Sequence, residues 1–139
     1  MRILSVCLIF ACLTASTLVN ADTPIDPITT CKAKKLSAAN YLRCLDRQVN
    51  DLSEKLTIWL NNKQFQLEEF AESSGHKTPL KVFKRSNNYF SKYMQEHCRW
   101  QYLMLLPDTA SAAMRLKECK INLLQQRLAE MIQVGGKVK

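Results

Sequence analysis

The sequence predicts an all-α fold, an antiparallel bundle of about three long helices stapled by two disulfides. Apolar residues recur at helical spacing over three long stretches. Only three glycines and four prolines occur, and they lie where helices are expected to end. Four of the six cysteines lie outside the N-terminal apolar segment, an even number that suits two disulfides. No stretch shows the alternation of a β-strand or a two-residue hairpin signal.

The first 21 residues have the three parts of a secretory signal peptide. Arg2 provides the positive start, residues 3–13 form an apolar run, and Val19-Asn20-Ala21 is a small-x-small ending. The run is shorter than the roughly 20 residues that span a bilayer. We therefore expect cleavage after Ala21, a mature chain of 118 residues in the periplasm or outside the cell, and no stable transmembrane anchor.

Two alternatives to cleavage stay open. The apolar segment can be retained as an N-terminal anchor. Ile9-Phe10-Ala11-Cys12 loosely resembles a bacterial lipobox, which would attach a lipid to Cys12, although Phe10 is bulky for that motif. The sequence does not decide between a soluble and a lipid-anchored form.

The mature chain divides into three segments. Residues 22–36, which contain Pro24 and Pro27, are expected to form an extended leader. Residues 37–134 are expected to form one helical domain, large enough to bury a core. Residues 135–139 begin with Gly135-Gly136, which ends the last helix, and form a basic tail.

The first long helix is expected to begin at Ser37, a good N-cap residue, and to end at Gly75. Its apolar seam repeats at spacings of three and four through Leu42, Leu45, Val49, Leu52, Leu56 and Trp59. The rhythm slips after Trp59, so we expect a kink or break near Asn61-Asn62.

The second and third long helices are expected to start at Thr78 and Asp108, each as an N-cap. In the second helix an aromatic-rich stripe, expected to face the core, comprises Phe83, Phe90, Tyr93, His97, Trp100 and Met104. In the third, the apolar positions are Ala113, Leu116, Ile121, Leu124, Leu128 and Met131. Short connections predict up-down-up packing of the three helices.

The four cysteines of the mature chain are Cys31, Cys44, Cys98 and Cys119. Their gaps of 13, 54 and 21 residues lack the close pairs of a zinc site, so we expect no metal. A helical hairpin turning near Asp108 places Cys98 and Cys119 at the same level. A leader folded back along the first helix brings Cys31 to Cys44. We therefore predict these two pairs from the three possible connectivities.

Three groups of residues around the cysteines resemble the lysozyme-inhibitor LprI-like domain, a small helical module of exported bacterial proteins. Leu45-Asp46 and Val49-Asn50 follow the first cysteine pair, Asn87–Tyr93 leads into Cys98, and Arg127 lies eight residues beyond Cys119. The resemblance covers residues 31–131, and the chain departs from the family pattern at Asn87, Phe90, Met94 and Leu124. It implies a divergent member that inhibits lysozyme or another cell-wall hydrolase.

The sequence contains no grouping of residues that indicates an enzyme, and we expect no cofactor. The two histidines are His76, in an expected turn, and His97, on the aromatic stripe. Although His97 adjoins Cys98, a cysteine in a disulfide cannot act as a nucleophile. Glu68, Glu69 and Glu72 are interpreted as the wet face of a helix rather than as a carboxylate pair.

The positive charge of the chain is the feature of the sequence that indicates most about function. The formal net charge is +8, and +7 without the signal peptide. Lys81, Lys84, Arg85 and Lys92 are predicted to form a binding surface for an anionic envelope component such as a lipid or glycan. A solvated face that keeps the protein soluble is the alternative. A second basic group lies around the expected second disulfide and comprises Arg99, Arg115, Lys117 and Lys120.

The sequence therefore leaves two functions open for an exported, non-enzymatic binding protein. One is inhibition of a cell-wall hydrolase, which follows from the resemblance alone. The other is binding to anionic lipid or glycan through the basic helix face. A nucleic-acid partner is not expected, because an exported chain rarely meets one.

Overall fold

The structure is a computed structural model that describes residues 26–135. The expected signal peptide, the alternative lipid site at Cys12 and residues 136–139 of the basic tail lie outside the described residues. The described chain forms four helices and no strand: α1 (Pro27–Ala33), α2 (Ala38–Ser74), α3 (Thr78–Leu103) and α4 (Thr109–Gly135).

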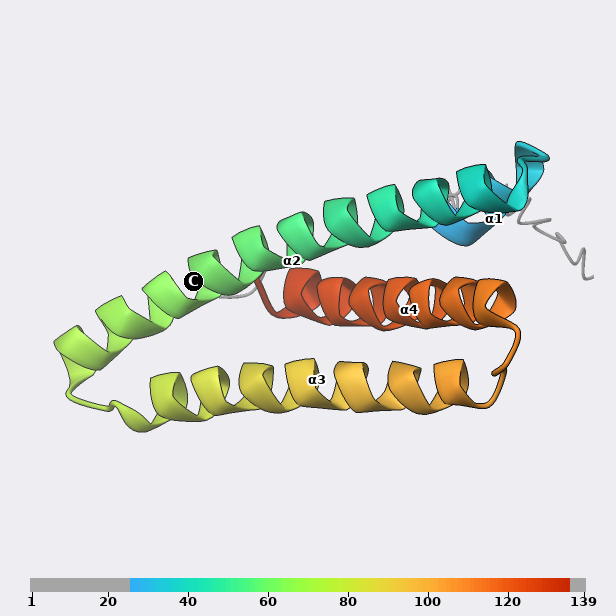
Figure 1. The fold of residues 1–139 in the computed structure, drawn as a ribbon. Helices are drawn as coiled ribbons and strands as arrows, with labels where there is room; N and C mark the ends of the chain where they lie inside the picture. Colours follow the sequence, from blue (N-terminus) through green and yellow to red (C-terminus); the bar gives the residue numbers. More distant parts are fainter. Residues whose placement is uncertain (1–25, 136–139) are drawn as a thin grey trace, which may run out of the picture.

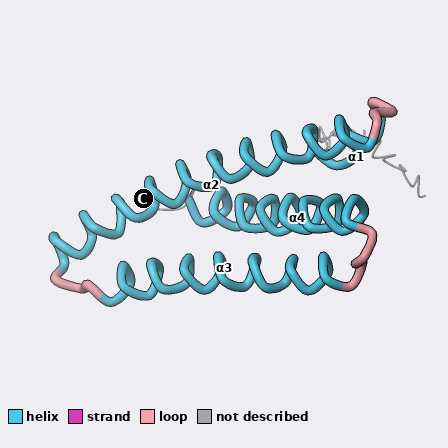
Figure 2. The backbone as a smooth tube through the Cα atoms, in the orientation of Figure 1, coloured by secondary structure: helices cyan, strands magenta, loops and turns pink. Residues whose placement is uncertain are grey.

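The three long helices run up, down and up, which confirms the predicted bundle (Figure 1). α4 lies between α2 and α3 and packs most extensively against α2. The α1–α2 and α3–α4 connections lie at one end of the bundle, and the α2–α3 connection lies at the other (Figure 2). Among the described helices, none is both long enough and apolar enough to cross a membrane.

The expected extended leader is wrong for residues 27–33, which form α1. The Asp26 side chain caps this helix by accepting hydrogen bonds from the backbone N–H groups of Ile28 and Thr29. Pro27 occupies a first-turn position, where its missing N–H costs no hydrogen bond. Pro27, which suggested extended chain, therefore lies at the start of a helix. Ile28 and Cys31 are the side chains through which α1 enters the core.

α2 is one continuous helix of 37 residues, so of the expected kink or break at Asn61-Asn62 the break is wrong. The Ser37 side chain caps its start by accepting a hydrogen bond from the backbone N–H of Asn40. Gly75 ends the helix with a left-handed φ of 74°. The predicted seam is confirmed, since Leu45, Leu52 and Leu56 are buried.

α3 and α4 begin close to their predicted caps. α3 starts one residue early, with Lys77 at the cap position and Pro79 in the first turn. Asp108 caps α4 by accepting a 3.1 Å hydrogen bond from the Ser111 amide, as expected. α3 ends at Leu103, and a short turn that includes Pro107 leads into α4.

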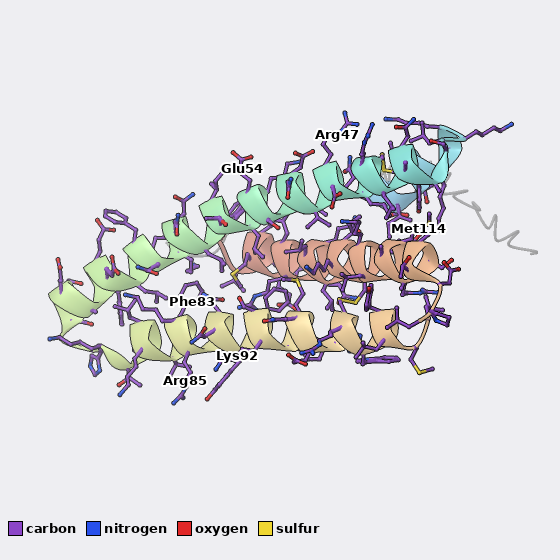
Figure 3. All side chains as sticks on the ribbon, viewed as in Figure 1. Arg47, Glu54, Phe83, Arg85, Lys92 and Met114 are labelled. Atoms are coloured by element: carbon purple, nitrogen blue, oxygen red, sulfur yellow. A yellow bond between two sulfur atoms is a disulfide. The ribbon has the colours of Figure 1, made fainter. Side chains whose placement is uncertain are left out.

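The core lies where α2 and α4 meet, with α1 covering one side. Its central side chains include Leu45, Leu52, Leu56, Ile121, Leu124 and Met131. From α3, Phe83, Phe90 and Met94 pack against this cluster while remaining partly exposed. Figure 3 shows Phe83 directed into the space between α2 and α3.

The prediction that the whole aromatic stripe faces the core is wrong. Phe83 and Phe90 do so, but Tyr93, Trp100 and Met104 are exposed. A helix that packs against neighbours on one side buries a strip narrower than that set of residues. The side chains at its edge therefore meet water.

Both predicted disulfides are present. Cys31–Cys44 ties α1 to α2 with a Cα–Cα distance of 5.9 Å. Cys98–Cys119 ties α3 to α4 with a Cα–Cα distance of 5.6 Å. All four sulfur atoms belong to buried residues, so the bridges are part of the core.

Candidate functional site

The outer side of α3 carries a basic strip made of Lys81, Arg85, Lys92 and Arg99. Their spacings of four, seven and seven place them on one face of the helix. All four side chains are exposed, and within residues 26–135 none lies within ion-pair distance of a carboxylate. Arg85 and Lys92 point away from the bundle (Figure 3). Four cations that are free of partners in the described part of the chain are available to an anion.

Lys84, which the sequence grouped with the basic strip, has a partner instead. Its Nζ lies 3.1 Å from Oε1 of Glu68 on α2. Hydrogen bonds from Lys84 and Gln64 lower the pKa of Glu68. Glu69 and Glu72 remain exposed on α2. Of the three glutamates, Glu68 ties α2 to α3.

Negative charge is concentrated on the opposite side of the bundle. α2 has six acidic and four basic residues, a formal charge of −2, while α3 has five basic residues and Glu96, a formal charge of +4. Glu54 projects from α2 on the side opposite Arg85 and Lys92 (Figure 3). Because α4 separates the two helices over much of the bundle, the molecule has one basic and one more acidic side.

An aromatic strip runs beside the basic strip on α3. Its members are exposed by 45–74% and comprise Val82, Tyr89, Tyr93, Trp100 and Met104. Spacings of seven and four keep them on one face, offset by one residue from the basic positions. His97 links two of the rings, stacking on Tyr93 at 5.0 Å and meeting Trp100 edge-on at 5.8 Å. The sequence contained this signal, but its periodicity was interpreted as core.

The second basic group is split by the fold. Arg99 belongs to the basic strip, and Arg115 is exposed near the α3–α4 turn. Lys117 instead forms an ion pair with Asp46 on α2, and Lys120 is partly buried. Of these four residues, Arg99 and Arg115 extend the basic surface toward the end of the bundle that holds the α3–α4 turn.

Arg127 joins α4 to the segment of α3 that leads into Cys98. Its Nη2 donates a 2.7 Å hydrogen bond to Oδ1 of Asn87, and its guanidinium lies 5.5 Å from the centre of the Phe90 ring. Nη1 pairs with Glu130 at 2.9 Å. With its side chain only 15% exposed, Arg127 holds α4 against α3 more than it offers a surface for binding.

A polar groove of about 480 Å³ lies between α1 and α3, above α4. Glu118 at its wall accepts a 2.7 Å hydrogen bond from the Tyr41 hydroxyl and pairs with Lys32 at 3.5 Å. Burial and this hydrogen bond raise the pKa of Tyr41. His97 and Cys119 also line the groove, but Cys119 is in a disulfide and is not a nucleophile.

Lys63 is a buried cation that the sequence analysis missed. Its Nζ donates hydrogen bonds to the Val134 carbonyl at the end of α4, at 3.3 Å, and to Gln66 Oε1 at 3.0 Å. Lys63 lies seven residues after Leu56, at a position that continues the apolar seam of the helix. This position is the feature of the sequence that indicates a buried lysine.

Among the described residues, no group of three or more His, Cys, Asp or Glu side chains is placed to hold a metal ion. The basic strip with its neighbouring aromatic strip is the candidate binding surface. No protein-family model, curated protein or solved structure matches this chain.

Proposed function

We propose that the protein is an exported, non-enzymatic binding protein that attaches to an anionic component of the bacterial envelope through the basic strip of α3. The observation that carries the proposal is the set Lys81, Arg85, Lys92 and Arg99, exposed on one face and free of carboxylate partners in the described chain. Two disulfides suit the oxidising periplasm or the cell exterior, where such a component is found.

Charge separation supports an oriented encounter. The field of α3 attracts an anionic surface, while the net negative charge of α2 favours keeping that helix turned away. A basic side chain that only solubilises the protein does not need this segregation. Attraction through exposed charges is screened beyond about 8 Å at physiological salt, so binding should depend strongly on ionic strength.

A charge-reversal experiment tests the proposal. The triple variant Lys81→Glu, Arg85→Glu, Lys92→Glu is compared with a matched triple on α2, Arg43→Glu, Arg47→Glu, Lys55→Glu, which changes the net charge equally. Binding to anionic vesicles and to a soluble polyanion, dextran sulfate, is measured over a salt series.

We expect the α3 triple to lose binding at least tenfold and the α2 triple to lose much less. Equal losses in the two variants would show that net charge alone matters. Binding that does not change with salt would contradict an electrostatic site.

Inhibition of lysozyme or another cell-wall hydrolase is the second candidate. Arg127 contacts Asn87 and Phe90, so two of the three segments that resemble the LprI-like domain meet in the fold, although Asn87 and Phe90 themselves depart from the family pattern. Animal lysozymes are typically basic, so the acidic exposed residues of α2, including Glu54, Glu69 and Glu72, would provide the complementary surface.

Titration of the protein against lysozymes and other muramidases tests this second function. Inhibition should fall in a Glu69→Lys, Glu72→Lys variant and remain in the α3 triple variant. Unchanged hydrolase turnover at excess protein would rule it out.

A further inference from the structure

Four consecutive exposed apolar residues lie at the α3–α4 turn. Leu103, Met104, Leu105 and Leu106 follow one another in the chain and are 37–74% exposed. Single exposed apolar residues are ordinary, but four in succession at the tip of a bundle have no solvation reason. We call Leu103–Leu106 together with Trp100 the apolar tip.

The apolar tip continues the aromatic strip of α3. Trp100, Met104 and Leu105 border one shallow hollow of about 210 Å³, which Gln101 of α3 and Arg115 of α4 also line. Trp100 is 52% exposed. An exposed indole between apolar side chains and an arginine has the amphipathic character of residues at a membrane–water interface.

Positive charge borders the apolar tip. Arg99 and Arg115 flank it, and the α1–α2 connection at the same end of the bundle contributes exposed Lys34 and Lys35 (Figure 2). Asp108 lies in this turn, but its carboxylate accepts the hydrogen bond that caps α4. Apolar side chains flanked by arginines match the layered chemistry of a bilayer with anionic headgroups.

The ring geometry favours a bilayer over a glycan as the partner. His97 and Trp100 meet at an interplanar angle of 86°, so Tyr93, His97 and Trp100 do not form one flat platform on which a sugar chain could stack. Aliphatic leucine side chains, which form most of the apolar tip, suit acyl chains.

We propose that the apolar tip inserts shallowly into an anionic phospholipid bilayer, with Arg99 and Arg115 at the level of the headgroups. This inference rests on the proposed function and names the anionic partner as a lipid surface. The basic strip brings the protein to the membrane, and the apolar tip anchors it there. A single apolar anchor of this size gives reversible attachment, comparable with one short acyl chain.

The experiment uses Trp100 as the reporter. The chain has two tryptophans, so Trp59→Phe leaves Trp100 alone. This protein is mixed with vesicles of phosphatidylcholine alone or of equimolar phosphatidylcholine and phosphatidylglycerol, with bromine on the acyl chains as quencher. We expect a blue shift and quenching of the Trp100 emission only with the anionic vesicles. Binding is followed in parallel by cosedimentation, which needs no tryptophan substitution.

A pair of matched double variants separates insertion from general hydrophobicity. Leu105→Ser, Leu106→Ser removes two side chains of the apolar tip, and Ile58→Ser, Phe65→Ser removes two exposed apolar side chains of α2. The first should weaken vesicle binding about tenfold or more, since each lost methylene group reduces partitioning several-fold. The second should bind as the parent does. Circular dichroism checks that each variant is folded.

The outcomes distinguish this inference from the proposed function. Salt-dependent vesicle binding without Trp100 quenching overturns insertion and leaves the basic strip as the site. Binding to dextran sulfate but not to vesicles makes a polyanionic polymer the partner and also overturns insertion. Loss of both kinds of binding overturns the proposed function itself. A dimer that dissociates in the Leu105→Ser, Leu106→Ser variant, without vesicle binding, would make a second copy the occupant of the apolar tip.

Discussion

At the scale of single residues, Arg127 makes a side-chain hydrogen bond that joins α4 to α3. It bonds to Asn87 and lies against Phe90, and most of its side chain is buried. A hydrogen bond to a charged group contributes about 1.5–3 kcal/mol to the free energy of unfolding.

We predict that Arg127→Ala lowers the free energy of unfolding by about 2 kcal/mol in urea denaturation. The stability of Arg127→Lys should lie between those of the parent protein and Arg127→Ala, because lysine keeps the charge but not the planar guanidinium. In a double-mutant cycle with Asn87→Ala, the losses should be less than additive. Additive losses would show that the two side chains do not interact.

Lys63 has a local role at the end of α4. A cation that donates a hydrogen bond to a carbonyl at the end of a helix also interacts favourably with the negative end of the helix dipole. This interaction stabilises the helix by about 0.3–1 kcal/mol in most cases. We predict that Lys63→Met increases hydrogen exchange in the last turn of α4, while Lys55→Met, at an exposed position of α2, does not. Unchanged exchange near Val134 would contradict this role.

At the scale of elements, carboxylate caps start α1 and α4. Hydrogen bonds from Thr29 lower the pKa of Asp26 below its ordinary 3.8, and hydrogen bonds from Ser111 do the same for Asp108. A lowered pKa in the folded state means that the unfolded chain binds more protons in acid. The stabilisation is therefore complete well above pH 4 and is lost as the pH falls below about 4.

We predict that Asp26→Asn and Asp108→Asn preserve stability at pH 7, since asparagine caps equally well. Each variant should lose less stability than the parent between pH 5 and pH 2, measured by urea denaturation. An acid response identical to that of the parent would show that these caps do not titrate as proposed.

The two disulfides act on different elements. α1 has seven residues, too few for a helix to be stable alone, so its position depends on Cys31–Cys44. Cys98–Cys119 joins α3 to α4 within the main bundle.

We predict that Cys31→Ala, Cys44→Ala removes hydrogen-exchange protection from α1 and largely spares α2–α4. Cys98→Ala, Cys119→Ala should lower the global free energy of unfolding by about 3 kcal/mol. If the first variant loses global stability and the second loses only local protection, the roles assigned to the two disulfides are reversed.

At the scale of the whole molecule, the distribution of charge and of exposed apolar side chains favours one orientation of the protein on an anionic membrane. The basic strip and the apolar tip both belong to α3 or its end, whereas α2 carries the excess of acid.

We predict that on anionic vesicles acylation of Lys81 and Lys92 slows severalfold, while Lys55 on α2 reacts as it does in solution. Mass spectrometry of peptides after brief acylation measures each site, and neutral vesicles serve as the control. Uniform protection of all three lysines would show that the protein binds without a preferred face.

The sequence by itself determined the features that depend on neighbours along the chain. Helix positions followed from the spacing of apolar residues, and the ends of α2 and the start of α4 followed from Ser37, Gly75 and Asp108. Both disulfides followed as well, because an antiparallel hairpin and a folded-back leader leave little choice of partner. The start of α1 escaped because Pro27 suits a first helical turn as well as extended chain.

Only the tertiary structure decided what depends on contacts between distant segments. Periodicity identifies an apolar face of α3 but not how much of it α2 and α4 cover. It therefore predicts that Tyr93 and Trp100 face the core, whereas both lie at the surface. The partners of Lys84, Arg127 and Lys63 come from other helices, 16, 40 and 71 residues away. A one-dimensional pattern records which side chains are apolar or charged, whereas their partners depend on the crossing of whole helices.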